Sequence, residues 1–453
     1  MSGLEVQMRG RDQLLARLDE ALAATGTESS EGFITARHGE FTRFAGTRVH
    51  QPQAIEECQL MVRAVTGSGS ARVGTTRLEA AEWAGRQAGL RARSMSKLGG
   101  PTHPVAEATP VPQGLQLWQE DTPEWDAGQR RTLATRALRT AESAGAIANG
   151  MFSTVLVELA VATSAGVSLY ACATEASCSI LVRHALGSGF RSDIARSADA
   201  LKSERLVEDA LADALRSTRP QELPPGPYDV VLGPLAVCDM LTFFAGIGFR
   251  GSAVAAGTGP VARRPGAQVA AAGIHVVDDA TRSIGLPIPF DLEGVGKLPV
   301  HMLEGGRVGA AVFDLATAAA VGRRSSGHAH IAREQAPEPT PANLILEPGP
   351  LSQTDLIAGI ERGVYISRFH YTRMVDPALT SFTGVTRDAS FLIESGQLGP
   401  AVTASRFTEE IFPVLSRVDG IGNDVVSLPI MNVWNGASSA PALRVRGFRL
   451  GFH

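Results

Sequence analysis

The amino-acid sequence predicts an α+β protein of two domains. Residues 1–222 are expected to form an α/β domain with an antiparallel sheet and flanking helices, and residues 223–453 a mostly β domain. The chain is too long for one ordinary core, and 44% of its residues are hydrophobic while 19% are charged, which favours packed globular domains. Strand-like runs with glycine turns alternate with segments of helical periodicity. The proline-rich residues 219–227 precede a sharply apolar run, and the boundary is placed there.

The first domain begins with an amphipathic helix, because Leu14, Leu15, Leu18 and Leu22 recur at helical spacing among charged residues. The elements predicted after it are strands over 32–50 and 60–73, a helix over 77–92, an ordered crossover over 98–128 with Trp118 and Trp125 as anchors, a helix over 126–144, strands over 154–162 and 167–173, and a charged helix over 193–217. The strands over 154–162 and 167–173 meet at the residues TSAG and are expected to form a hairpin.

The second domain is predicted to start with the strand Tyr228–Leu232 and to end with a strand over Ala442–Gly451. Between them, short strands alternate with glycine turns and a few helices. The almost wholly apolar residues 235–247 are expected to form a helix that is buried in the core, because exposing it to water is costly.

Composition and charge exclude several classes of protein. The net charge is −4 and no long basic run occurs, so nucleic acid is not expected as a partner. No apolar signal core is visible at the N-terminus, and the most apolar stretch, Val155–Ala173, is interrupted by Glu158. We therefore expect neither secretion nor a membrane span, and expect a cytoplasmic protein. The four cysteines lack paired spacing and are expected to be buried, reduced thiols.

Most catalytic signatures are absent. Gly294-Val-Gly-Lys297 lacks the upstream glycine and the following Ser or Thr of a phosphate-binding loop, so a turn is favoured. Ser164 lies in a sequence similar to a nucleophile elbow, but a strand follows it where that motif needs a helix. Cys238 has no cationic neighbour to stabilise a thiolate, which favours a core residue.

Two further groups of polar residues have both a functional and a structural interpretation. His328 and His330 have the chemistry of metal ligands, but no third ligand is near in sequence, which favours a solvated loop. Asp278 and Asp279 follow a strand-like run, and adjacent residues of a strand face opposite sides, so the two carboxylates are expected to open a turn and not to share a proton.

The second domain contains a series of motifs in a fixed order. They are Val230–Pro234 (VVLGP), Pro289–Gly294 (PFDLEG), Leu303–Gly306 (LEGG), Asn343–Gly349 (NLILEPG), Arg362–Tyr365 (RGVY), Phe391–Gly396 (FLIESG) and Pro441–Val445 (PALRV). The series resembles the TldD/PmbA family of bacterial peptidases, and residues 41–51 and 72–78 resemble its N-terminal domain. The resemblance implies a heterodimer that degrades extended peptides, in which only the TldD-type subunit holds metal on a helix with the pattern His-Glu-x-x-x-His.

The flanks of that helix are retained at 230–233 and 248–251, which matches its three key positions to Thr242, Phe243 and Ile247. Threonine is no plausible zinc ligand, phenylalanine cannot act as a base, and isoleucine cannot coordinate a metal. The family's third ligand, a cysteine near the C-terminus, is missing too, because no cysteine follows Cys238. The resemblance therefore implies a PmbA/TldE-type subunit that holds no metal of its own, with zinc expected in a TldD-like partner.

The leading hypothesis is a metal-free subunit that shapes the peptide-binding cleft of a TldD/TldE-like metallopeptidase, with strand edges of the first domain pairing with extended peptide. One alternative is a repurposed member acting on a small amide or peptide-like metabolite, with His275, His301, His328 and His370 as suspects. A non-catalytic scaffold is another.

Several motif positions are predicted to line the cleft or to form turns: Asp291, Glu293, Gly294, and Ser326-Gly327 as a loop facing substrate. For Asp291 and Glu293, a structural role is favoured, in which the two carboxylates cap turns and hold a subunit interface.

Overall fold

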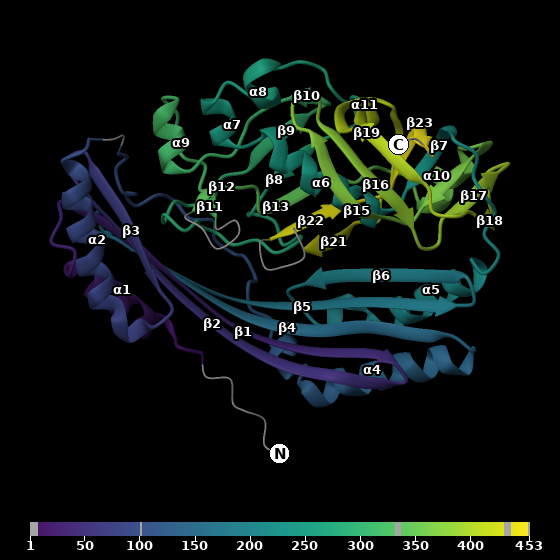
Figure 1. Ribbon diagram of the computed structural model, residues 1–453, viewed down its shortest axis with the longest axis horizontal. Helices are drawn as coiled ribbons and strands as arrows, with labels where there is room; N and C mark the ends of the chain where they lie inside the picture. Colours follow the sequence, from purple (N-terminus) through teal and green to yellow (C-terminus); the bar gives the residue numbers. More distant parts are fainter. Residues whose placement is uncertain (1–7, 100–101, 331–336, 430–435, 452–453) are drawn as a thin grey trace.

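The computed structural model describes residues 8–99, 102–330, 337–429 and 436–451. A long curved sheet has helices of the N-terminal half on one face and the C-terminal half of the chain on the other (Figure 1). The expected α+β class is confirmed by this arrangement. Within the described residues, none of the helices combines the length and the apolar character that crossing a bilayer requires.

The curved sheet has six antiparallel strands in the order β3-β2-β1-β4-β5-β6. The strands are β1 (Ser29–Gly46), β2 (Arg48–Thr66), β3 (Gly69–Thr75), β4 (Ile147–Thr163), β5 (Ser168–His184) and β6 (Gly187–Ala195). Successive side chains point to opposite faces of a strand. Ile34 therefore packs with the helices, while its neighbour Phe33 packs with residues of the C-terminal half.

The helices beside this sheet are α1 (Arg11–Ala23), the 3-10 turn Leu78–Ala80, α2 (Ala81–Ser96), α3 (Asp121–Glu124), α4 (Ala127–Ser143), the 3-10 turn Asp199–Leu201 and α5 (Ser203–Arg216). The apolar stripe of α1 is confirmed, because Leu14 and Leu18 are fully buried against β1 and β2. Asp126 begins α4 as predicted, since its side chain accepts a hydrogen bond from the backbone N–H of Gln129.

The C-terminal half contains two six-stranded sheets, a three-stranded sheet and a two-stranded ribbon among the described residues. Their strands are β7 (Gly226–Leu232), β8 (Val276–Asp278), β9 (Val300–Glu304), β10 (Arg307–Val308), β11 (Ala329–His330), β12 (Glu338–Pro339), β13 (Asn343–Leu346), β14 (Arg362–Ile366), β15 (Arg368–Asp376), β16 (Ser381–Arg387), β17 (Phe391–Glu394), β18 (Gln397–Ala401), β19 (Arg406–Glu410), β20 (Val418–Ile421), β21 (Val426–Pro429), β22 (Ala437–Ala440) and β23 (Leu443–Leu450). The predicted strands at 228–232 and 442–451 are confirmed as β7 and β23.

The helices of this half are α6 (Pro234–Gly248), α7 (Gly251–Ala255), α8 (Gly259–Arg263), α9 (Leu315–Ala320), α10 (Gln353–Ala358) and α11 (Ile411–Ser416). The largest hydrophobic core of the molecule surrounds α6. Several aromatic rings of this core are in contact, and the ring centroids of Phe369 and Phe407 lie 4.4 Å apart with the two planes tilted by 43°.

One predicted element in the first half is wrong at its start, and one strand segment was not predicted. Residues 187–195 form β6, so the helix predicted from residue 193 begins only at Ser203. The stretch between the two predicted strands, residues 51–59, belongs to β2. Most of these β2 residues are exposed, so the apolar alternation that reveals a half-buried strand is missing there.

Candidate functional site

One face of helix α6 is partly exposed, while the rest of the helix is buried, and we call this face the stripe of α6. Pro234 occupies its first turn, where a missing backbone N–H costs nothing. Most of its side chains lie in the core, whereas Asp239, Thr242 and Phe243 are half-buried and Gly246 is exposed. These four positions follow the spacing of one helix face. The prediction that the helix is buried is therefore right for its core face and wrong for this stripe.

Two side chains on the stripe, Thr242 and Phe243, make contacts that serve packing, whereas the Asp239 carboxyl has a hydrogen bond with Thr372. The hydroxyl of Thr242 donates a hydrogen bond to the carbonyl oxygen of Cys238, 3.1 Å away and one turn earlier in the helix. The ring of Phe243 stacks on Phe382, with 6.5 Å between the centroids. The side chain of Ile247 lies outside what the structure describes. Neither Thr242 nor Phe243 offers a zinc ligand or a general base.

The expected thiol chemistry of α6 is confirmed. Cys238 is buried, and its Sγ lies 3.2 Å from the carbonyl oxygen of Ser438. Burial raises the pKa of this thiol far above its usual range, so it stays protonated.

A protein-family model matches the C-terminal half of the chain. A family model described as the PmbA/TldA metallopeptidase C-terminal domain matches residues 225–451, which is half of the chain. The chain belongs to the TldD/PmbA family. A curated relative from Methanothermobacter thermautotrophicus (strain Delta H), named metalloprotease, is 26% identical over 211 residues, which are 47% of this chain and 46% of that protein. The chain thus matches less than half the length of that relative.

Solved structures share the fold over nearly the whole chain. TldE from Thermococcus kodakarensis matches with a TM-score of 0.86 at 17% identity, covering 96% of this chain and 100% of that one. A protein of Thermotoga maritima, described as a candidate modulator of a DNA gyrase, matches with a TM-score of 0.85 at 18% identity, covering 97% and 99%. At these identities the matches establish the TldD/PmbA-like fold, and α6 is its helix after β7.

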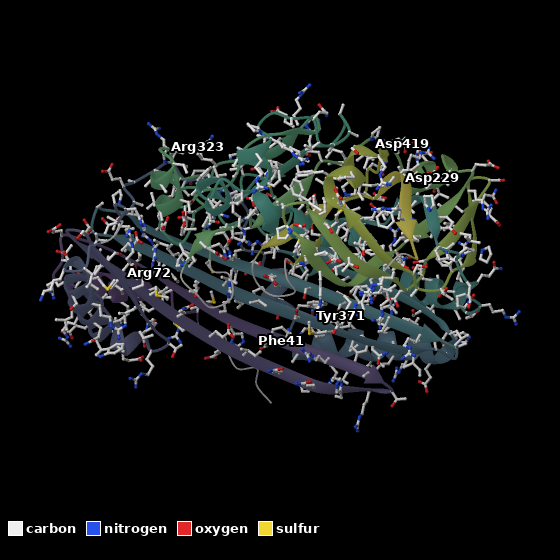
Figure 2. The ribbon with its side chains drawn as sticks, turned by 45° about the horizontal axis from the view of Figure 1, so that its top comes forward. Phe41, Arg72, Asp229, Arg323, Tyr371 and Asp419 are labelled. Carbon is white, nitrogen blue, oxygen red and sulfur yellow. The ribbon has the colours of Figure 1, made fainter. Side chains whose placement is uncertain are left out.

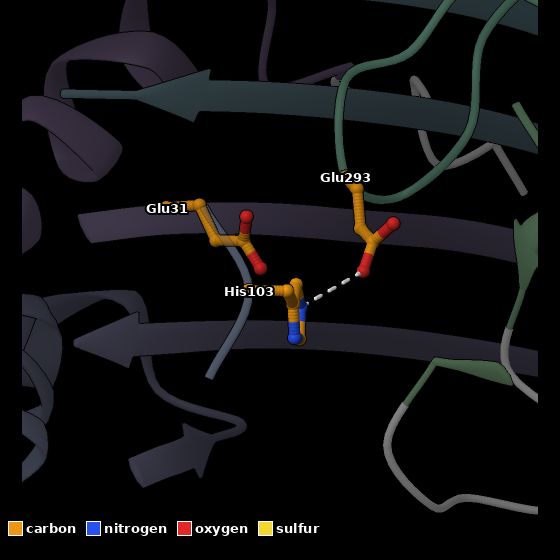
Figure 3. A group of neighbouring side chains, drawn as sticks. All are labelled: Glu31, His103 and Glu293. Atoms are coloured by element: carbon orange, nitrogen blue, oxygen red, sulfur yellow. Dashed lines mark ion pairs between the residues drawn. The ribbon is translucent and has the colours of Figure 1, made fainter. Parts of the chain in front are cut away.

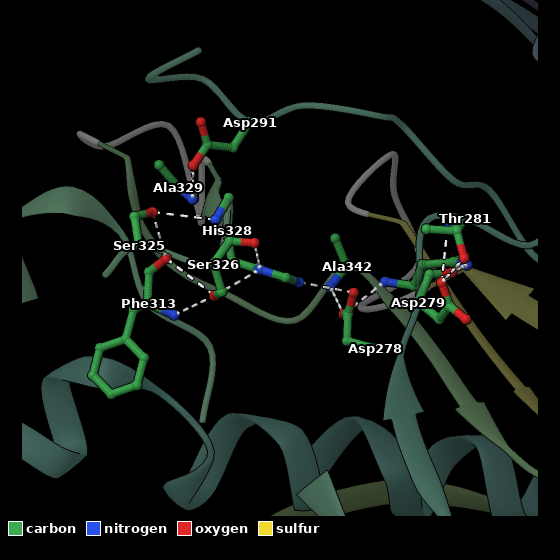
Figure 4. A network of polar contacts seen from close by, with 12 residues as sticks. Asp278, Asp279, Thr281, Asp291, Phe313, Ser325, Ser326, His328, Ala329 and Ala342 are labelled. Carbon is green, nitrogen blue, oxygen red and sulfur yellow. Dashed lines mark hydrogen bonds and ion pairs between the residues drawn. The ribbon is translucent and has the colours of Figure 1, made fainter. Parts of the chain in front are cut away.

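In the C-terminal half, Ser326, His328 and Asp278 are in contact in the sequence of contacts of a Ser-His-Asp triad (Figure 4). The Oγ of Ser326 lies 3.0 Å from Nδ1 of His328, whose Nε2 lies 2.9 Å from Oδ1 of Asp278. The Ser326 hydroxyl also accepts the backbone N–H of Phe313, and His328 is fully buried. A nucleophile must reach its substrate, and this hydroxyl faces the interior. The network therefore holds loops together.

This network corrects three predictions. His328 lies in the core and not in a solvated loop. Asp278 is buried and accepts the backbone N–H groups of Ala342 and Asn343, whereas only Asp279 opens a turn, by accepting from Thr281. The loop Ser326-Gly327 was expected to face substrate, but both residues are buried. Sequence spacing missed the network because its members lie 50 residues apart.

The charge states in the network follow from burial. Burial lowers the pKa of His328, although Asp278 beside it opposes the shift. For Asp278, burial favours the protonated form, but His328, the Lys297 charge and the backbone N–H of Asn343 outweigh it and hold the pKa well below its usual range. A neutral imidazole paired with a carboxylate is the arrangement that these shifts support near neutral pH.

The predicted cleft residues Asp291, Glu293 and Gly294 lie at the junction between the first sheet and the C-terminal half. Asp291 accepts the backbone N–H groups of Glu293 and Val295, which closes a turn. Gly294 has a φ of +84°, and a Cβ there would lie 2.8 Å from Cγ1 of Val167 after β4. The turn capping that sequence favoured for Asp291 is thus observed.

Burial has a strong effect on the first carboxyl of this loop. Burial, together with the neighbouring Glu293 charge, raises the pKa of Asp291 to about 8. Glu293 is 1% exposed, and its Oε2 accepts the backbone N–H of Leu315 at the start of α9. The two carboxyl groups therefore serve the loop and the helix next to it.

Two residues far from this loop in sequence meet Glu293 at the junction, Glu31 of β1 and His103 of the crossover (Figure 3). One donor atom from each of the three lies within 4.8 Å of the others, and Nε2 of His103 is 3.7 Å from Oε1 of Glu293. We call Glu31, His103 and Glu293 the junction cluster. Sequence spacing could not reveal it, because its members come from three separate segments.

Two arginines of the first sheet border the junction cluster. Arg63, 1% exposed, donates from Nε to Oε1 of Glu31 at 2.6 Å. Arg72 projects from β3 at the end of the sheet that carries α1 and α2 (Figure 2). Its guanidinium lies 4.0 Å from Glu31 and 3.9 Å from Glu293. Strand register places Glu31, Arg63 and Arg72 side by side on the face toward the C-terminal half.

The other suspected histidines are scattered. His275 accepts the backbone N–H of Gly305, His301 is exposed on β9, and His370 is half-buried on β15. Burial and the Arg387 and Arg368 charges lower the pKa of His370. The structure brings none of these three into the junction cluster.

Proposed function

We propose that this chain is the subunit without a catalytic metal, as in a TldE/PmbA-type chain that holds no metal on α6, of a two-chain TldD/TldE-like metallopeptidase, in which a TldD-type partner supplies the catalytic zinc. The observation that carries the proposal is the stripe of α6. The resemblance expects the metal helix at α6, and two of the described side chains there are a threonine and a phenylalanine that serve packing. A subunit built in this way shapes the cleft, and the partner performs the hydrolysis.

The proposed substrate is extended peptide, which a strand edge binds through backbone hydrogen bonds and with little regard to side chains. Between Arg48 and Gln59, β2 pairs with β1 alone among the described strands, because its ladder with β3 begins at Leu60. This edge is exposed over much of its length. We propose it as a strand-pairing surface for peptide in a cytoplasmic heterodimer.

The test is co-expression of this chain with a TldD-type subunit from the same organism. We expect the two chains to co-purify and the pair to cleave an unfolded peptide in a chelator-sensitive manner, at least tenfold faster than the partner alone. Thr242→Ala with Phe243→Leu in this chain should leave that rate within about twofold, because neither residue takes part in the chemistry.

The matched control is the same pair with the glutamate of the partner's metal helix replaced, which should abolish cleavage. Failure to co-purify, or equal cleavage by the partner alone, contradicts the proposal. Turnover of a small amide by this chain alone, insensitive to chelators, would support the repurposed enzyme instead.

A further inference from the structure

Each residue of the junction cluster has one buried polar atom without a hydrogen bond. Oε2 of Glu31, Nε2 of His103 and Oε1 of Glu293 are buried, and no described residue forms a hydrogen bond with any of them. Buried polar atoms without a partner are costly, and native proteins keep few of them unless a ligand or water satisfies them. We propose that the junction cluster binds one divalent transition-metal ion of the zinc type, which clamps the first sheet to the C-terminal half.

Each carboxylate of the cluster accepts a hydrogen bond at one oxygen and has no hydrogen bond at the other. Arg63 donates to Oε1 of Glu31 at 2.6 Å, and the backbone N–H of Leu315 donates to Oε2 of Glu293 at 2.8 Å. Arg63 also donates to the carbonyl oxygens of His103 and Pro104, at 3.1 and 3.3 Å, and so fixes the segment that carries the imidazole. Such outer hydrogen bonds are what orients the ligands of a metal site.

The donor set selects the class of ion. One imidazole nitrogen with two carboxylate oxygens suits zinc and its transition-metal neighbours, whereas calcium and magnesium prefer oxygen ligands alone and higher coordination numbers. Zinc binds such ligands at about 2.0–2.2 Å, so two ligands of one ion lie at most about 4.4 Å apart. The donor atoms lie within 4.8 Å of one another, and a small inward shift completes the site.

Arg72 is the cation that competes with the metal. Its guanidinium faces both carboxylates at 3.9 and 4.0 Å, beyond hydrogen-bond distance, and its side chain is 28% exposed. The same cluster without a metal is an ion-pair network in which two arginines balance two glutamates. A bound ion repels Arg72, which can turn toward solvent. Removing its charge therefore strengthens metal binding if the site exists, and weakens the cluster if it is only an ion-pair network.

The experiment is calorimetric titration of Zn²⁺ into the chelator-stripped, full-length chain, with thermal unfolding measured in parallel. We expect one site per chain and a higher Tm with zinc. His103→Gln and Glu293→Gln should each weaken binding at least tenfold and remove the zinc-dependent rise in Tm, while Arg72→Gln should bind zinc more tightly. His103→Gln, at a residue that is partly exposed, is the variant least able to disturb folding.

Glu175→Gln is the matched control. Glu175 is a buried carboxyl on the same face of the same sheet, with Arg196 and Arg37 nearby, and it is not part of the cluster. It should bind zinc as the unaltered chain does. Equal zinc affinity in the unaltered chain and in His103→Gln, or weaker zinc binding in Arg72→Gln, would overturn the proposal. The measurement uses this chain alone, so its outcome is independent of whether a TldD-type partner exists.

Discussion

The stripe of α6 and the junction cluster are built in opposite ways. The stripe belongs to one helix, so the spacing of a few neighbouring residues is enough to say what that face can bind. The junction cluster takes Glu31 from β1, His103 from the crossover and Glu293 from a loop of the C-terminal half. At the positions where the resemblance expects the ligands of a metal helix, α6 has a threonine and a phenylalanine, whereas the donor atoms of the metal site proposed above come together only in the folded chain.

The largest change in the free energy of unfolding is expected for a substitution on the core face of α6. Phe244 is 3% exposed and its ring lies 4.5 Å from that of Phe249, so Phe244→Ala should lower the free energy of unfolding by about 3–5 kcal/mol. Thr242→Ala, two positions earlier on the half-open stripe, should cost within about 1 kcal/mol. Urea unfolding of both variants measures the difference. Equal losses would mean that the stripe is as deeply packed as the core face.

Sequence predicted the architecture where one segment contains its own signal. The amphipathic periodicity of α1, the helical segment 126–144 that contains α4, and the apolar runs of β4, β5, β7 and β23 lie in the sequence itself, and the structure places elements there. Residues 51–59 and β6 were missed because their side chains do not alternate between apolar and polar. The alternation of apolar and polar side chains reveals a strand only because one face of the strand is buried. A strand without a buried face has no such alternation, although its backbone hydrogen bonds are formed.

The same limit holds for the sites: features within one segment could be predicted from the sequence, and contacts between distant segments could not. The match of Thr242 and Phe243 to the family's ligand positions rests on the resemblance and on spacing along one helix, and the turn formed by Asp291 follows from a short motif. The pairing of Asp278 with His328 and the convergence of Glu31 and His103 on Glu293 depend on strand register and loop docking. Burial inverted the interpretation of His328, because a polar residue in a polar stretch of sequence is usually solvated.

The next largest change in the free energy of unfolding is expected in the network of Asp278, His328 and Ser326, whose members come from distant segments of the chain. Asp278→Asn should lower the free energy of unfolding by about 1.5–3 kcal/mol, because it removes the charge that His328 and two backbone N–H groups contact. Asp279→Asn is the matched control, since this neighbour caps only a local turn and should cost about 1 kcal/mol. Urea unfolding at neutral pH compares them. A larger loss at Asp279 would contradict the importance of the buried network.

The pH dependence of the same network is a smaller effect. The pKa of folded His328 is lowered, so the unfolded chain binds the proton more readily, and stability present above about pH 6.5 is lost as pH falls toward the folded pKa. The slope for one proton is about 1.4 kcal/mol per pH unit. Asp278 also has a lowered pKa, and its contribution is lost in more acidic solution, below about pH 4.

His328→Gln isolates the first of these contributions. The difference in free energy of unfolding between the unaltered chain and this variant should shrink between pH 7 and pH 5, because only the unaltered chain loses the His328 contribution. Urea unfolding at three or four pH values in that interval measures it. A difference that stays constant with pH would show that His328 titrates alike in the folded and unfolded chains.

The smallest expected effect returns to α6 and compares it directly with the junction cluster. Thr242→His, Phe243→Glu and Ile247→His together restore the family's pattern, yet we expect no peptide cleavage by this chain alone, because no cysteine follows Cys238 to act as third ligand. The variant should also contain His103→Gln, which removes a ligand of the junction cluster, so that zinc bound by the variant is bound on α6. Peptidase assays with added zinc provide the measurement. Zinc-dependent cleavage would show that two histidines and a glutamate on α6 are enough for catalysis, and would contradict the expectation that a third ligand is needed.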